Sequence, residues 1–327
     1  MKPILTVHDL SKDFVKSLDL VAKLLNRVGQ DYRVETVHAV DDVSFDVFKG
    51  EIVGVVGESG CGKSTLGRMV AGILPPTAGE VHFDDSQAKN PDIPLALRTQ
   101  MIFQDPFSSL NPRKRVIDII TEAPIYHKLI DKSEKHEFAT TMLARVGLDP
   151  DSLQRYPHQF SGGQRQRVGI ARALAVSPEF LVCDESIAAL DVSIQAQIIN
   201  LFVDLKSKFD LTYLFISHDI GVIEHISDRV IVMYLGRIVE TAPIEAFIKQ
   251  PNHPYTNALL AGVPRLEAGK RSYEPIVGEI PSPLDPPTGC HFHPRCKFAT
   301  ARCKAEKPAL REIAPAHFSA CHLNDEA

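Results

Sequence analysis

The sequence has no long apolar run, no excess of basic residues and no low-complexity tract. No stretch approaches the roughly 18 apolar residues that a membrane-spanning helix needs. Charges at Asp9, Lys12 and Asp13 stand where a secretory signal would be apolar. With 36 Lys and Arg against 41 Asp and Glu, the net charge is −5, without the basic field that nucleic-acid binding requires. We therefore expect a cytoplasmic chain with no nucleic-acid partner, whose contact with a membrane is peripheral.

The composition is that of an ordinary globular protein. Of the 327 residues, 44% are hydrophobic and 24% are charged, which suits one large α/β domain with a small appendage. Eight prolines fall between positions 251 and 287, where they disfavour long regular elements. We expect a domain at 1–250 and an extension at 251–327.

Short apolar runs alternate with helical patterns, which is typical of buried parallel strands. The runs are 52–57, 101–104, 180–185, 212–218 and 229–236. A helix is predicted over 64–74, with one apolar face made of Leu66, Met69, Val70, Ile73 and Leu74, and ended by the two prolines that follow. Between 105 and 165 the strand pattern gives way to helical stretches at 115–123 and 135–146, which predicts a helical subdomain inserted into the sheet domain.

A glycine-rich loop lies between the first of these strands and its helix, the context that supports a phosphate-binding loop. Its candidate ligands for a nucleotide are Gly57, Gly60, Gly62, Lys63, Ser64 and Thr65. The glycines let backbone N–H groups face the phosphates, and the helix N-terminus adds positive potential. We expect Lys63 to reach the β- and γ-phosphates and Ser64 to ligate Mg²⁺.

The apolar strand 180–185 ends in two carboxylates, Asp184 and Glu185. An acidic strand end is a weak signal alone, but beside a phosphate-binding loop it is where a nucleotide-bound metal must sit. We assign Asp184 to Mg²⁺ and Glu185 to the general base that activates water.

The segment Phe160-Ser161-Gly162-Gly163-Gln164 resembles the signature motif of ATP-binding cassette (ABC) ATPases. The resemblance implies an α/β phosphate-loop NTPase fold: a RecA-like mixed sheet core, an inserted α-helical subdomain and an N-terminal antiparallel β subdomain. In that family two cassettes sandwich two ATP molecules, so Ser161, Gly162, Gly163 and Gln164 are expected to bind the ATP held by the partner cassette.

Further family markers follow in the same order along the chain. The resemblance implies that Gln104 senses Mg²⁺, that Asp191 acts across the dimer and that His218 contacts the γ-phosphate. The sequence departs from the family at 186–188, Ser-Ile-Ala, where Pro-Thr-Ser is common. The carboxylates are untouched, so we expect activity to survive, with altered communication across the dimer.

An aromatic ring is expected to stack on the adenine, because base stacking needs only an aromatic face. Phe14 is the candidate and Tyr32 the alternative. Apolar residues at helical spacing between 18 and 28 suggest a surface helix, in a segment (15–34) that interrupts the first strand region.

Nearly the whole chain, except about 15–34, resembles the ATPases of oligopeptide, dipeptide and nickel ABC importers, through residues 55–59, 104–113 and 253–256. The resemblance is close to the subunit that forms the second ATPase of a heterodimer. The resemblance implies a second ABC ATPase, two transmembrane permeases and, indirectly, an extracytoplasmic solute-binding protein as partners, at the cytoplasmic face of the inner membrane. The function implied is ATP hydrolysis that powers uptake of peptides or a related small solute. The alternative is a soluble ABC ATPase of translation or repair, but such proteins usually carry two cassettes or a coiled-coil insertion.

Four cysteines crowd the C-terminus with the spacing C-x5-C-x6-C-x17-C: Cys290, Cys296, Cys303 and Cys321. In a reducing compartment such a group favours metal over disulfides, and it suits zinc and an iron–sulfur cluster alike. The two-residue spacing of a zinc ribbon is absent, and the family resemblance implies a [4Fe–4S] cluster. His291 and His293 are alternative ligands, whereas Cys61 and Cys183 are expected to take no part.

Overall fold

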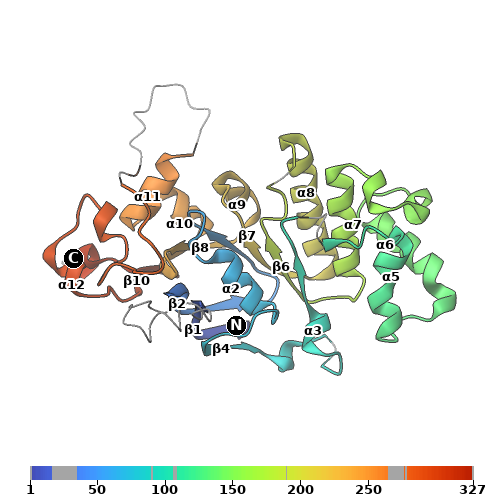
Figure 1. Cartoon of the computed structure of the whole chain (residues 1–327), viewed down its shortest axis with the longest axis horizontal. Coiled ribbons are helices and arrows are strands. Elements are labelled where there is room, and N and C mark those ends of the chain that lie inside the picture. The colour runs from blue at the N-terminus through green and yellow to red at the C-terminus, as the bar shows by residue number, and fades with distance from the viewer. Residues whose placement is uncertain are drawn as a thin grey trace, which may run out of the picture.

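A computed structural model describes residues 2–16, 35–89, 91–105, 109–188, 190–263, 276 and 278–325. Two sheets organise this part of the chain (Figure 1). The main sheet has eight strands in the order β10-β11-β9-β8-β3-β7-β6-β5, and a three-stranded sheet has the order β2-β1-β4. The bounds of the smaller sheet are β1 (Pro3–Lys16), β2 (Glu35–Phe48) and β4 (Ala78–Phe83), all paired antiparallel.

The centre of the main sheet is parallel, as the apolar runs predict. Its parallel strands are β3 (Ile52–Val56), β5 (Thr99–Ile102), β6 (Phe180–Asp184), β7 (Thr212–Ile216) and β8 (Arg229–Tyr234). Every residue of β3, β6 and β7 is buried, because layers cover both faces of this sheet. Alternate residues of β3 serve the two cores: Ile52 packs into one, and Val53 into the other.

Helices cover the sheet and form the inserted subdomain at one end of the molecule (Figure 1). Their bounds are α2 (Lys63–Val70), α3 (Leu95–Arg98), α5 (Val116–Tyr126), α6 (Lys135–Arg145), α7 (Gly162–Leu174), α8 (Val192–Phe209), α9 (Ile220–Ile226) and α10 (Ile244–Lys249). Short 3-10 turns lie at Asp85–Gln87, Lys132–Glu134, Pro150–Gln154 and Pro157–Gln159. Both α5 and α6 lie where the sequence predicts helices between 105 and 165.

The helix predicted over 64–74 is shorter than expected. It ends at Val70, because Gly72 takes a left-handed backbone conformation with φ +70°. Ile73 is 53% exposed and so does not belong to the buried face, whereas Leu66, Met69 and Val70 do. The prolines that follow therefore come after the helix has already ended.

The C-terminal part of the chain joins the main sheet. Strand β9 (Arg237–Pro243) runs antiparallel to β8 and pairs with β11 (His317–Ser319), which pairs with β10 (Arg311–Ala314). The other elements of this part are α11 (Pro254–Ala261), α12 (Ala301–Ala305) and 3-10 turns at His293–Arg295 and His322–Asp325. None of the helices in the described ranges is long and apolar enough to cross a bilayer.

Candidate active site

The phosphate-binding loop runs from Gly57 to Ser64, between β3 and α2. Gly62 has φ +103°, and a Cβ there would lie 2.2 Å from the carbonyl oxygen of Ala39. A side chain is therefore excluded by backbone strain and by a close approach. Lys63 is 4% exposed, and its ammonium donates to the carbonyl oxygens of Gly57 (2.8 Å) and Glu58 (3.0 Å). The cation is thus held inside the loop that is expected to receive phosphate.

The two residues predicted to ligate Mg²⁺ meet beside this loop. The hydroxyl of Ser64 donates to Asp184 Oδ1 at 2.7 Å. Asp184 ends β6 and is 3% exposed. Burial raises the pKa of its carboxyl, and the charge of Glu185 adds to the rise, while the hydrogen bond from Ser64 opposes it. A bound cation would relieve this desolvated carboxylate.

Glu185 collects the other predicted catalytic side chains. Gln104 donates to its Oε2 at 2.9 Å, and the Nδ1 atom of His218 lies 3.5 Å from the same oxygen. Glu185 also has a left-handed backbone, φ +45°, a conformation that is uncommon for residues other than glycine. Two side chains, each following its own strand, therefore converge on one carboxylate oxygen of Glu185.

The donor set suits Mg²⁺. Hydroxyl, carboxylate and amide oxygens are supplied by Ser64, Asp184 and Gln104, and Mg²⁺ in nucleotide sites usually takes one or two protein carboxylates plus phosphate oxygens. The Ser64–Asp184 contact already holds two of these groups within 2.7 Å of one another. The chain's own residues therefore fit a nucleotide-bound magnesium ion.

The signature segment lies elsewhere, at the start of α7. Ser161 caps this helix: its hydroxyl accepts from the Gln164 backbone N–H at 3.4 Å, and the Gln164 side chain accepts from the Ser161 N–H at 3.0 Å. Gly163 packs so tightly on Ile194 that an added Cβ would lie 2.4 Å from its side chain. Figure 1 shows α7 well away from α2. Within one chain these residues and the phosphate-binding loop form separate sites.

Most of the other residues predicted to contact nucleotide, on the signature segment, at Asp191 and at Phe14, are exposed to solvent. Ser161, Gly162 and Asp191 are exposed, and Asp191 precedes α8 as its N-cap. Phe14, on β1, is 43% exposed. Tyr32 and the helix expected near 18–28 lie outside the described residues.

The other three C-terminal cysteines lie close enough to Cys290 to influence its thiol. None is in a disulfide. Burial raises the pKa of Cys290 to about 11, and the thiols of Cys303, Cys321 and Cys296 add to the rise. Even so, among the described residues no group of three or more His, Cys, Asp or Glu side chains is arranged to hold a metal ion. The expected metal centre is therefore not confirmed: the donor types fit, but the sulfurs do not converge.

The histidines named as alternative ligands are already engaged through one ring nitrogen. His291 Nδ1 lies 2.9 Å from the carbonyl oxygen of Leu235, and His293 Nδ1 lies 2.9 Å from that of Cys290. Cys61 and Cys183 are buried, and burial raises the pKa of both thiols. Such thiols stay protonated and unreactive, in keeping with the minor role expected of them.

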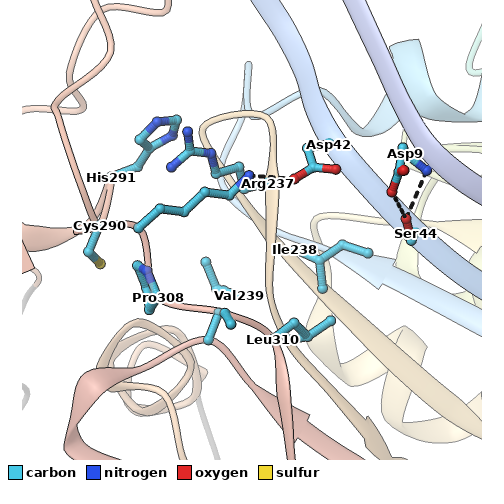
Figure 2. Close-up of a pocket in the computed structure, with 13 residues that line it drawn as sticks. Asp9, Asp42, Ser44, Arg237, Ile238, Val239, Cys290, His291, Pro308 and Leu310 are labelled. Atoms are coloured by element: carbon cyan, nitrogen blue, oxygen red, sulfur yellow. Dashed lines mark hydrogen bonds and ion pairs between the residues drawn. The ribbon is translucent and has the colours of Figure 1, made fainter. Parts of the chain in front are cut away.

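A cavity of about 410 Å³ lies between part of the extension and strands β1, β2 and β9 (Figure 2). Its walls come from β1, β2, β9 and the extension, including Cys290 and His291. Two polar contacts bridge the two sides: Lys307 pairs with Asp42 at 2.7 Å, and Arg237 donates to the carbonyl oxygen of Gly289 at 3.0 Å. The extension is thus fastened to the cassette around this cavity.

Two contacts at the phosphate-binding loop were not foreseen from the sequence. The side chain of Arg295 and the hydroxyl of Tyr255 both reach Glu58, from positions almost 200 residues or more along the chain. No local sequence pattern predicts such pairs, because each residue taken alone is an ordinary polar or aromatic residue.

Comparison with known families matches residues 40–188 to the family described as ABC transporter. Residues 239–303 match the family described as oligopeptide/dipeptide transporter, C-terminal region.

Two curated relatives cover most of the chain. The oligopeptide transport ATP-binding protein AppF of Bacillus subtilis (strain 168) is 51% identical over 299 residues, which cover 89% of this chain and 91% of AppF. The probable peptide ABC transporter ATP-binding protein y4tS of Sinorhizobium fredii is 48% identical over 299 residues, with 90% and 85% covered.

Solved structures agree on the fold. The cbiO1 protein of Clostridium perfringens, part of the ABC transporter complex cbiONQ, has a TM-score of 0.60 at 25% identity and covers 77% of this chain and 93% of its own. The ATP-binding cassette MJ0796, in a dimeric post-hydrolysis state bound to ADP and Pi, has a TM-score of 0.59 at 26% identity, with 73% and 98% covered. The chain therefore belongs to the ABC transporter ATP-binding family, in the branch whose members carry the oligopeptide/dipeptide transporter C-terminal region.

Proposed function

We propose that this chain hydrolyses ATP to power a bacterial ABC importer of di- or oligopeptides, or of a related small solute. One observation carries the proposal: Gln104 and His218 converge on Glu185 Oε2, beside the Ser64–Asp184 pair and the phosphate-binding loop. Relatives about half identical to this chain are named as peptide transport ATP-binding proteins, which supports the substrate class.

The site residues divide the work of phosphoryl transfer. Loop amides and Lys63 bind the phosphates, and Glu185 accepts a proton from the attacking water, which Gln104 and His218 help to orient. Mg²⁺ held by Ser64, Asp184 and Gln104 would neutralise charge that develops on the phosphate oxygens.

The exposed signature segment and Asp191 are proposed to complete the site of a second cassette, which we expect to be a different ABC ATPase subunit. Phe14 is proposed to stack on the adenine of the ATP bound by its own chain. Two permease subunits would hold the ATPase pair at the cytoplasmic face of the membrane as a peripheral assembly, and an extracytoplasmic solute-binding protein would deliver solute. This arrangement separates the proposal from a soluble ABC ATPase of translation or repair.

The decisive experiment uses the transporter purified with its co-encoded permeases and second ATPase, and compares wild type with Glu185→Gln and Glu245→Gln. Glu185→Gln removes the base but keeps the shape, so we expect turnover at this site to fall by about 100-fold or more while ATP stays bound. Glu245 is an exposed residue of α10, and its variant should match wild type. Normal turnover by Glu185→Gln refutes the assigned base. Equal turnover with and without permeases favours the soluble alternative.

A [4Fe–4S] cluster at Cys290, Cys296, Cys303 and Cys321 remains a proposal, as does the division of the chain near residue 250. The free thiols and the closeness of the other three cysteines to Cys290 support the cluster, whereas the absence of a metal-holding group among the described residues speaks against it. Anaerobic purification with measurement of iron, sulfide and zinc tests it, with the Cys303→Ser variant as the comparison. Iron and sulfide that are lost together in the variant support the cluster, and zinc or no metal refutes it.

A further inference from the structure

Every polar group of Glu58, the second residue of the phosphate-binding loop, has a partner. Its backbone N–H donates to the hydroxyl of Tyr255 at 2.8 Å, and its carbonyl oxygen accepts from Lys63 at 3.0 Å. Its two carboxylate oxygens accept from the two terminal nitrogens of Arg295, at 2.6 Å and 3.0 Å. Tyr255, on α11, and Arg295 both belong to the C-terminal extension, so the loop is held in part from outside the cassette core.

Arg295 is itself held rigidly. Its side chain is 5% exposed, and one of its nitrogens also lies 3.4 Å from the hydroxyl of Tyr234, whose ring centre is 5.8 Å from the guanidinium. The Tyr234 ring packs against those of Tyr255 and Phe292, with centres 4.7 Å and 5.2 Å away. A bidentate guanidinium on an aromatic platform fixes both the position and the direction of its partner carboxylate.

The charge of Glu58 makes this pairing matter for nucleotide binding. A carboxylate in a loop that receives a polyanion opposes binding, because like charges repel strongly where water is partly excluded. The Glu58 side chain is 21% exposed, so solvent screens it only in part. Arg295 neutralises the carboxylate and draws it toward the extension, while Lys63 keeps its ammonium on the carbonyl oxygens of the loop.

We propose that Arg295 is a positioning residue for ATP binding, acting through Glu58 to cancel a repulsive charge and hold the phosphate-binding loop. The proposal rests on the proposed function, since it takes this loop as the ATP site. It gives the C-terminal extension a role inside the catalytic unit, through a residue that contacts no substrate.

The test measures ATP turnover and its KM in the purified transporter for Arg295→Met, Glu58→Gln and the double variant. Arg295→Met leaves the Glu58 carboxylate without its positive partner, so we expect the KM for ATP to rise roughly tenfold with little change in kcat. In the double variant the stranded charge is gone, and the KM should return to within about twofold of that of Glu58→Gln. Arg295→Lys keeps the charge without the two-pronged contact and should raise the KM by about threefold.

Lys307→Met is the matched control, because Lys307 also ties the extension to the cassette, through Asp42 on β2, without contacting the loop. It should leave the KM unchanged. A wild-type KM in Arg295→Met and Arg295→Lys overturns the proposal. The proposal is also overturned if the KM is raised in Arg295→Met and stays raised in the double variant with Glu58→Gln, because a purely structural role of Arg295 predicts that result. Glu185→Gln in the same preparation separates the two failures: if it turns over normally, the proposed site is wrong, and if it does not, only the role of Arg295 is.

Discussion

Acid should destabilise the C-terminal part of this protein through His253, which lies just before α11. The side chain is 1% exposed, and its Nδ1 atom accepts the backbone N–H of Tyr255 at 3.1 Å. Burial lowers the pKa of His253 to about 3, because a buried imidazolium has lost its hydration. The folded protein therefore keeps this ring neutral under conditions in which an exposed histidine would be charged.

The direction of the pH effect follows from proton uptake. Below the ordinary pKa of 6.5 the unfolded chain binds a proton at His253 that the folded chain does not bind. The contribution to stability is therefore complete above pH 6.5 and is lost as the pH falls from 6.5 toward 3. One pKa unit corresponds to about 1.4 kcal/mol, so the loss is at most roughly 5 kcal/mol and reaches about 2 kcal/mol at pH 5.

The comparison that isolates this effect is wild type against His253→Asn. Asparagine can still accept the N–H that caps α11, but it does not titrate. The contact between His317 Nε2 and Glu240, 2.7 Å long, is present in both proteins, as is the hydrogen bond from the His253 backbone to Glu240, so the two proteins differ only at the His253 side chain. Urea unfolding of the full chain between pH 7.5 and pH 5.0, followed by circular dichroism, measures the free energy of unfolding. We expect wild type to lose about 2 kcal/mol more than His253→Asn, and equal losses would refute the assignment.

Three further changes test the nucleotide site. Gly62→Ala should abolish ATP binding and lower the melting temperature, because a Cβ would meet the Ala39 carbonyl at 2.2 Å and deform the loop. Fluorescent-nucleotide titration and thermal unfolding check this, and wild-type affinity would contradict it. Phe14→Ala should weaken ATP binding by roughly 10-fold, because about 1–3 kcal/mol of stacking is lost. The binding of GTP should weaken to the same extent. An unchanged dissociation constant would assign the stacking to another aromatic residue. Tyr255→Phe removes the hydroxyl that accepts the Glu58 N–H, so thermal unfolding should show a stability loss of about 1–3 kcal/mol; no loss would mean that water replaces the hydroxyl.

Much of the candidate site could be predicted from short local patterns in the sequence. Three features could be predicted because each depends on neighbouring residues of one strand, turn or helix. They are the parallel strands, the glycine-rich loop and the strand end at Asp184 and Glu185. Family resemblance added Gln104 and His218, and the structure places both on Glu185. Helix α2 ends at Val70, before the two prolines from which the sequence predicts its end, because Gly72 takes a left-handed conformation.

The cysteines show the limit of spacing as a guide. Sequence distance alone brings Cys290, Cys296 and Cys303 into one neighbourhood, and the structure adds Cys321 to it. Whether the sulfurs converge on a metal depends on the directions of side chains on irregular backbone. Sequence periodicity does not predict these directions.

The sequence by itself determined the fold class, the loop predicted to bind nucleotide and the residue types of the predicted catalytic cluster, because periodicity and motif spacing are local properties. The tertiary structure alone decided how the extension meets the cassette: β11 adds to the main sheet through β9, and Arg295 lies on Glu58, 237 positions earlier. Such a pairing depends on which surfaces pack together after the strands have been ordered, and it leaves no trace in the neighbourhood of either residue.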